Sequence, residues 1–183
     1  MNRMRAGLLA GVTVGIALLA TTPASGAPQA DAAASLTKSE ARQLEDRMAE
    51  QLRRHPGGKA VSRNSVSYDN GSVVVTLPLK DGAAKGPAGA SGVPDCDRGS
   101  VCLYEHDNFN GLRVSFYRCE MHSLGSFTDK MTSWHNNQTG GVQAVMYDVD
   151  GNGRIYDYDR LVVGQNPNVG RALNDRANLI RPC

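Results

Sequence analysis

The sequence predicts an all-β fold for residues 95–183, preceded by a small helix and a β-hairpin. One observation behind this is the spacing of short apolar alternations between Gly, Asn and Asp turns, namely VCLYE, LRVSFY, VQAVMY and RIYDY. Such spacing is typical of antiparallel strands. The other observation is an internal repeat within the same residues. With 183 residues, 40% of them hydrophobic and 21% charged, the chain has the composition of one globular domain with appendages.

The repeat aligns VCLYEHDNFNG with AVMYDVDGNG, 43 residues further on, and places Tyr104 on Tyr147. Acidic residues and, after a one-residue gap, a glycine also align: Glu105 with Asp148, Asp107 with Asp150, and Gly111 with Gly153. Each copy is followed by a similar stretch, DKMTS after the first and NDRAN after the second. A duplicated four-strand unit is the simplest explanation.

Residues 1–27 have the pattern of a secretory signal peptide. Arg3 and Arg5 form a basic start, an uncharged apolar run covers residues 6–20, and small residues follow. A membrane anchor is the alternative, but the run contains glycines and is shorter than the ~20 residues that a span needs. Without the two arginines, 18 basic residues balance 18 acidic ones. The mature chain is therefore formally neutral, and this charge balance predicts neither nucleic-acid binding nor membrane binding.

The segment at residues 28–77 reads as a helix-hairpin extension, and its first part is amphipathic. In SLTKSEARQLEDRMAEQLRRHPGG, Thr37 and Glu40 form a capping box. Four apolar side chains follow at helical spacing on one stripe: Ala41, Leu44, Met48 and Leu52. The PGG sequence ends the predicted helix.

The second part of the extension, VSYDNGSVVVTL, predicts the hairpin. Asn70 and Gly71 supply the positive φ values of a tight turn. Five apolar side chains are expected to face the helix: Val66, Tyr68, Val73, Val75 and Leu77. One helix and one hairpin make a very small core, so we expect this unit to pack against something else. Residues 78–94, rich in Gly, Ala and Pro, predict a flexible linker to the domain at residues 95–183.

All four cysteines lie in the second half of the chain: Cys96, Cys102, Cys119 and Cys183. An even number in an exported protein predicts two disulfides, for which three connectivities are possible. A zinc site is the alternative, but the five-residue gap between the first two cysteines is too wide for the usual zinc knuckle.

The stretch YEHDNFNG predicts a hairpin that folds back over its own sheet. Gly111 is free to take positive φ, and two aromatics, Tyr104 and Phe109, can pack edge to face and pin the turn. An ordinary strand, loop and strand is the alternative.

Tyr104, Phe109, Gly111 and, further on, Ser133 resemble the Greek-key signature of βγ-crystallins. From CDRGSVCLYEHDNFNGLRVSFYRC to LIRPC, the chain resembles secreted actinobacterial peptidase inhibitors with this fold, whose namesake inhibits thermolysin-like metalloproteinases. The resemblance implies a double Greek key. It also implies disulfides that pair Cys96 with Cys102 and Cys119 with Cys183. The second key departs from the signature, because Asn152 stands near the aromatic position.

The reactive bond of such inhibitors cannot be carried over to this chain. In the namesake it lies in a small disulfide loop, and Cys119 has no near cysteine partner here. The reactive bond is therefore unknown, and CEMHSLGSF, residues 119–127, is only a hypothesis for an exposed loop.

No catalytic residue is predicted. His55, His106, His122 and His135 fall in no ligand motif, and neither a nucleophile elbow nor a zinc-protease motif is present. We therefore expect a protein that is not an enzyme.

A calcium-binding site is a more specific hypothesis than a catalytic site. DVDGNGRIYDYD places Asp148, Asp150 and Asn152 at the first ligand positions of an EF-hand-like loop, although its flanks are β-like. The calcium motif of βγ-crystallins is half kept, with Asp129, Thr132 and Ser133 in place in the first copy. The candidate metal set is Glu105, Asp129, Ser133, Asp148, Asp150 and Asn152. A run of Asx turns is the structural alternative.

The sequence thus predicts a secreted, disulfide-linked, monomeric βγ-crystallin-like inhibitor that occludes the active site of an extracellular protease, most simply a thermolysin-like metalloproteinase. It requires no cofactor, with calcium as an optional ligand. The alternative is a non-inhibitory extracellular protein of the same fold that binds calcium or is antimicrobial.

Overall fold

The computed structural model describes residues 36–79 and 94–183 of the chain. The predicted signal peptide at residues 1–27, the start of the extension and most of the predicted linker at residues 78–94 lie outside these residues. Among the helices of the described ranges, none is long and apolar enough to cross a bilayer.

The amphipathic segment forms helix α2, Lys38–Arg54, as predicted. The Thr37 hydroxyl accepts a hydrogen bond from the Glu40 amide at 3.2 Å, and the Glu40 carboxylate accepts one from the Thr37 amide at 2.7 Å. This capping box satisfies two amides that the helix leaves without internal partners. Leu44 and Met48 are buried on the inner face of the helix.

The extension continues as a three-stranded antiparallel ribbon. The turn between its second and third strands uses positive φ at Asp69, Asn70 and Gly71. Its elements are β1 (Lys59–Ala60), β2 (Ser65–Tyr68), the 3₁₀ turn η1 (Asp69–Gly71) and β3 (Val73–Thr76).

The expectation that all five apolar hairpin residues face the helix is wrong for two of them. Val66 and Leu77 pack with Leu44 and Met48 of the helix. Val73 and Val75 belong instead to the core of the second half of the chain. The cause is strand order, because β3 pairs along β5 of the large sheet and its inner side chains lie over that core.

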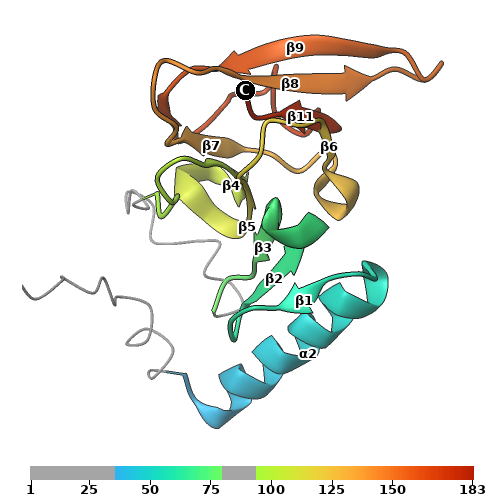
Figure 1. Ribbon diagram of the computed structural model, residues 1–183. Helices are drawn as coiled ribbons and strands as arrows, with labels where there is room; N and C mark the ends of the chain where they lie inside the picture. The colour runs from blue at the N-terminus through green and yellow to red at the C-terminus, as the bar shows by residue number, and fades with distance from the viewer. Residues whose placement is uncertain (1–35, 80–93) are drawn as a thin grey trace, which may run out of the picture.

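The remaining strands form a sandwich of two antiparallel sheets (Figure 1). The first four-strand unit comprises β4 (Val101–His106), η2 (Asp107–Phe109), β5 (Asn110–Phe116), β6 (His122–Ser123), η3 (Gly125–Phe127) and β7 (Ser133–Asn136). The second comprises β8 (Ala144–Val149), β9 (Ile155–Leu161), β10 (Gly164–Asn166) and β11 (Leu179–Arg181).

The strand order is that of two interlocked Greek keys. One sheet runs β1-β2-β3-β5-β4-β7-β10 and the other β6-β11-β8-β9. The third strand of each unit, β6 or β10, therefore crosses to the sheet of the other unit. In each unit the fourth strand returns beside the first. The all-β, βγ-crystallin-like double Greek key preceded by a helix and a hairpin is confirmed.

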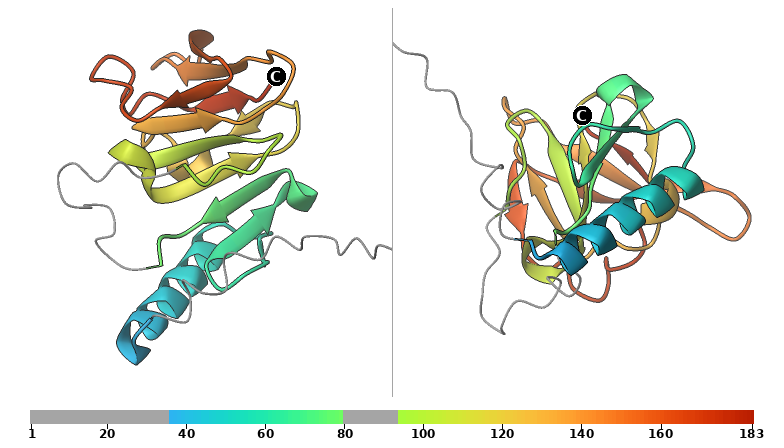
Figure 2. Two further views of the ribbon diagram at one scale, coloured as in Figure 1. Left: turned by 90° about the vertical axis from the view of Figure 1, so that its left-hand side faces the viewer. Right: turned by 90° about the horizontal axis from the view of Figure 1, so that it is seen from below.

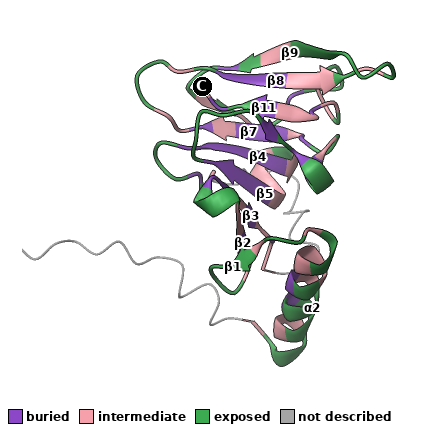
Figure 3. Ribbon diagram, turned by 45° about the vertical axis from the view of Figure 1, so that its right-hand side comes forward, coloured by how far each residue is buried: buried purple, intermediate pink, exposed green. Residues whose placement is uncertain are grey.

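The space between the sheets holds one apolar core (Figure 3). Its large buried members include Leu103, Phe116, Met131, Trp134 and Ile180. The helix lies at one end of the molecule and the β8–β9 hairpin at the other (Figure 2). The extension and the hairpin are thus separated by the body of the sandwich.

Two disulfides close the second half of the chain. Cys96 is bonded to Cys102, with Cα atoms 5.7 Å apart, and Cys119 is bonded to Cys183, with Cα atoms 5.0 Å apart. These are the two pairs that the family resemblance implies. The second disulfide connects the segment after β5 to the C-terminus, just beyond β11.

Candidate functional site

The hairpin of the first key is folded over its own sheet. The rings of Tyr104 and Phe109 meet edge to face, with centroids 5.5 Å apart and planes at 72°. Gly111 has φ +80°, and a Cβ atom there would lie 2.7 Å from a carbon of the His106 ring. The Ser133 hydroxyl donates to the His106 carbonyl at 2.6 Å and accepts from the Phe109 amide at 3.1 Å. These contacts hold the turn closed.

The Tyr104 hydroxyl belongs to this structural corner. It donates a hydrogen bond to Asp95 at 3.3 Å. Burial, and then the negative charge of Asp95, raise the pKa of Tyr104 well above its ordinary value. The phenol therefore stays neutral at physiological pH, and its geometry is that of a core residue.

We expect Ser133→Ala to lower the free energy of unfolding by about 1 to 3 kcal/mol, because it leaves a carbonyl and an amide without their partner. Urea unfolding followed by tryptophan fluorescence measures this. Ser126→Ala is the matched control, since Ser126 is exposed, and it should change stability by less than about 0.5 kcal/mol. Equal effects of both substitutions would contradict the proposed role of Ser133.

The hairpin of the second key is not folded over in the same way. Leu179 stands where the first key has Ser133, and Asn152 stands where it has Phe109. The β8–β9 ladder continues to Val149 and Ile155, and the turn projects from the sandwich (Figure 1). The Asp150 carboxylate stabilises this turn by accepting hydrogen bonds from the amides of Asn152 and Arg154, both at 2.9 Å.

The β8–β9 hairpin and the segment after it form the most apolar exposed surface in the described part of the chain. Of eight exposed large hydrophobic side chains there, five lie in residues 149–163: Val149, Ile155, Tyr156, Val162 and Val163. Strand β9 also ends its sheet, so no strand of the described residues covers its outer edge. An exposed edge with apolar side chains is a surface that accepts another chain.

The residues of the candidate calcium set are distributed over separate places. Glu105 accepts a hydrogen bond from the Leu112 amide within its own hairpin. Ser133 is used by the Tyr104 corner, and Asp150 and Asn152 lie in the β8–β9 turn. Among the residues that the structure describes, no group of three acidic, histidine or cysteine side chains could hold a metal ion.

Asp148 and Asp129 come closest to forming a site, because both contact the loop that precedes β11. Asn178 donates to Asp129 at 3.1 Å, and its side-chain carbonyl accepts from the Val149 amide at 2.7 Å. Asp148 is ion-paired with Arg176. Partial burial alone would raise the pKa of the Asp148 carboxyl, but hydrogen bonds from Tyr156, Arg176 and the Val149 amide outweigh it and lower that pKa.

The hypothesis that residues 119–127 form an exposed loop is wrong for three of its side chains. His122, Leu124 and Phe127 are buried. The segment contains β6 and η3, and β6 pairs with β11. Other side chains of the segment, Met121, Ser123 and Ser126 among them, are exposed to solvent.

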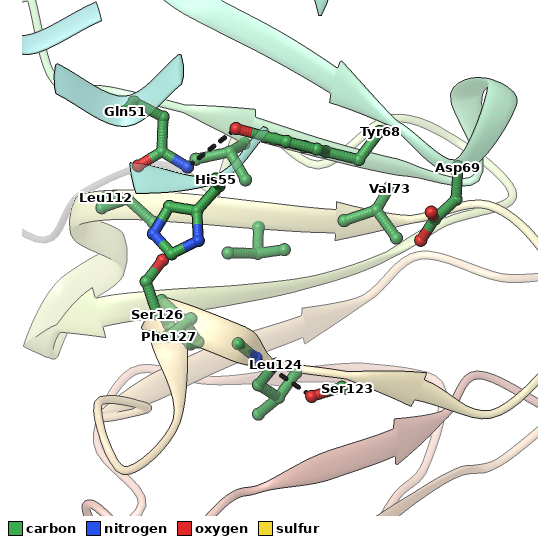
Figure 4. Close-up of a pocket in the computed structure, with 13 residues that line it drawn as sticks. Gln51, His55, Tyr68, Asp69, Val73, Leu112, Ser123, Leu124, Ser126 and Phe127 are labelled. Carbon is green, nitrogen blue, oxygen red and sulfur yellow. Dashed lines mark hydrogen bonds between the residues drawn. The ribbon is translucent and has the colours of Figure 1, made fainter. Parts of the chain in front are cut away.

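A pocket of about 160 Å³ lies where the extension meets the Greek-key domain (Figure 4). Its lining includes the apolar side chains of Val75, Val114 and Phe127. Gln51 and Tyr68 also line it, and the Gln51 side-chain amide donates a hydrogen bond to the Tyr68 hydroxyl at 3.1 Å. The sequence offered no signal for this pocket, because its walls come from segments that only the tertiary structure brings together.

Residues 89–158 match the model of peptidase inhibitor family I36. The matched segment is less than half of the chain and runs from before β4 into β9.

Comparison with solved structures finds similarity to βγ-crystallin domains. A double mutant of a βγ-crystallin domain from Clostridium beijerinckii is 24% identical, covers 45% of this chain and 93% of its own, and gives a TM-score of 0.34. The N-terminal domain of Protein S is 19% identical, and the match covers 45% of this chain and 92% of that domain, with a TM-score of 0.33. A third structure, described under the evolution of the eye lens βγ-crystallin domain fold, is 21% identical. The match covers 49% of this chain and 91% of that chain, with a TM-score of 0.35. No curated protein matches the chain.

Proposed function

We propose that the protein is a secreted, monomeric inhibitor that occludes the active site of an extracellular protease, with a thermolysin-like metalloproteinase as the target. The observation that carries this proposal is the projecting β8–β9 hairpin. Its apolar side chains and open strand edge offer what a protease cleft binds, namely an extended backbone with bulky apolar side chains.

The fold supports this role by keeping the hairpin ordered. A β-ladder and an Asx turn hold the tip, and the two disulfides stabilise the sandwich behind it. Little conformational entropy then remains to be lost on binding, which favours affinity. Two disulfides are also typical of proteins that fold in an oxidising, extracellular compartment.

The test is residual protease activity against increasing amounts of the oxidised chain. A thermolysin-like metalloproteinase, a cysteine protease and a serine protease are assayed side by side. We expect stoichiometric loss of the metalloproteinase activity. Loss of another activity alone would reassign the target, and no loss from any protease would favour the non-inhibitory calcium-binding or antimicrobial alternative.

Ile155→Asp tests whether the hairpin makes the contact. Ile155 is 59% exposed, so the substitution should leave stability unchanged, yet it places a charge among the exposed apolar side chains of the hairpin. We expect the inhibition constant to rise by about 30-fold or more, the effect of losing a hot-spot residue. Val61→Asp is the matched control, because Val61 is 60% exposed but lies on the extension at the other end of the molecule. A larger loss of inhibition from Val61→Asp would place the contact at the extension.

A further inference from the structure

The loop that precedes β11 carries an arginine whose position is specific to the second key. In the strand register Ser133 lies opposite Tyr104 and Leu179 lies opposite Tyr147, which aligns Asp129 with Asp175. Both aspartates have positive φ, +56° and +53°. This alignment pairs Lys130 of the first key with Arg176 of the second. Lys130 is exposed to solvent. Arg176, in contrast, is held by several contacts from the body of the domain.

The guanidinium of Arg176 binds oxygen atoms from two sides. Its Nε and Nη2 atoms donate to one oxygen of the Asp148 carboxylate at 3.2 and 3.1 Å. Its Nη1 atom donates to the Ala172 carbonyl at 3.1 Å. The same group lies over the ring of Tyr158, 5.0 Å from the ring centre. A cation is therefore already present among a carboxylate, a carbonyl and an aromatic face.

These oxygens are of the kind that calcium prefers. Ca²⁺ takes carboxylate and backbone carbonyl oxygens as ligands. Here the Asp148 oxygen that faces Arg176 also accepts from the Tyr156 hydroxyl at 2.8 Å. The Asp148 side chain is only 16% exposed, and that of Arg176 is 40% exposed. A divalent ion could reach this carboxylate only by displacing the guanidinium, so calcium does not fit the second key as it stands.

We propose that Arg176 is the built-in cation of the second Greek key, which holds Asp148 and the Ala172 carbonyl together and makes this half of the domain independent of calcium. The inference goes beyond protease inhibition and does not depend on it. Removal of the guanidinium should uncover a calcium site at Asp148.

The test compares thermal unfolding of the full oxidised chain in chelator, in about 10 mM calcium and in about 10 mM magnesium. Arg176→Met keeps an unbranched apolar side chain but removes the charge and the hydrogen-bond donors of the guanidinium. In chelator we expect this variant to unfold about 3 to 8 °C below the wild type. Calcium should then raise its midpoint by about 3 °C more than it raises that of the wild type. Arg176→Lys should stay insensitive to calcium at this site.

Two further variants connect the calcium response to this position. Adding Asp148→Asn to Arg176→Met should abolish the extra calcium shift. Arg160→Met removes an arginine that is paired with Asp157 on the exposed part of β9, and it should change the midpoint by less than about 1 °C. Titration calorimetry should find one additional calcium site in Arg176→Met, with a dissociation constant of about 10⁻⁴ to 10⁻³ M.

Three outcomes would overturn the inference. The first is calcium binding by the wild type that is lost in the single variant Asp148→Asn, which would show that calcium displaces Arg176. The second is an Arg176→Met variant as stable in chelator as the wild type. The third is an Arg176→Met variant that responds equally to calcium and magnesium, or to neither.

Discussion

Deletion of residues 28–79 is expected to leave a Greek-key domain that is less stable and that self-associates. Strand β3 covers the edge of β5 along four residue pairs, from Val73 opposite Phe116 to Thr76 opposite Arg113. Without β3, the amide and carbonyl groups on that edge of β5 lose their partners, and an uncovered edge pairs with other chains. Light scattering after size exclusion should show dimers or larger species for the domain alone and monomers for the intact chain.

The stability loss has a second source in the core. Val73 and Val75 are each only 8% exposed and pack with the Greek-key residues. Burying a valine side chain contributes about 1.5 to 3 kcal/mol, so the loss of both should cost about 3 kcal/mol or more. A deletion product that stays monomeric and unfolds at the temperature of the intact chain would show that the extension is only an attachment.

A point substitution separates this core contact from the deletion itself. Val75→Ala removes buried methyl groups but keeps the extension, and it should lower the unfolding free energy by about 1 to 2.5 kcal/mol. Val61→Ala is the control on the same extension, because its side chain is exposed, and it should change stability by less than about 0.5 kcal/mol.

Removal of the Cys119–Cys183 disulfide is expected to destabilise the domain by about 2 to 5 kcal/mol. The bridged residues are 64 apart in the sequence, so the bond removes much of the freedom of the unfolded chain. It also anchors the C-terminus beside β11, a strand of three residues that pairs with both β6 and β8. Substitution of both cysteines by alanine, followed by chemical unfolding, measures the effect.

The second disulfide supplies the comparison for this experiment. Cys96 and Cys102 are only 6 residues apart, and the chain-entropy estimate for so short a loop is roughly 2.4 kcal/mol, against roughly 4.3 kcal/mol for the long one. Hydrogen exchange should show that loss of the long-range bond opens Leu179–Arg181 first. A larger loss from the Cys96–Cys102 pair would mean that local packing, and not loop closure, determines the contribution of each bond.

Much of the fold was predictable because its signals are local. The capping box of Thr37 and Glu40, the positive-φ turn at Asn70 and Gly71, and the alternation in residues 95–183 each act over a few residues. The repeat of Tyr104 and Tyr147 indicated two similar units, and the structure contains them as two Greek keys. Periodicity and turn chemistry are sufficient for such features, because neighbouring residues alone determine them.

The candidate site was less predictable because it depends on what distant segments leave uncovered. Nothing in the alternation of residues 144–161 indicates that the β8–β9 hairpin projects. That follows from the absence of a serine at Leu179, 27 residues after the Asn152 position it would have to pin. For residues 119–127 the prediction fails for the converse reason, since the sequence does not indicate that His122, Leu124 and Phe127 are buried when β6 pairs with β11.

By itself, the sequence determined the signal peptide pattern, the helix and hairpin of the extension, the β-class of the second half and its duplicated, cysteine-containing plan. Only the tertiary structure decided that β3 completes the large sheet, that β6 and β10 exchange between the sheets, and that Arg176 reaches Asp148. The physical reason is the range of the interactions. Propensities, caps and turns act between neighbours in the chain, whereas strand order, burial and ion pairing depend on which distant segments meet when the apolar faces are removed from water.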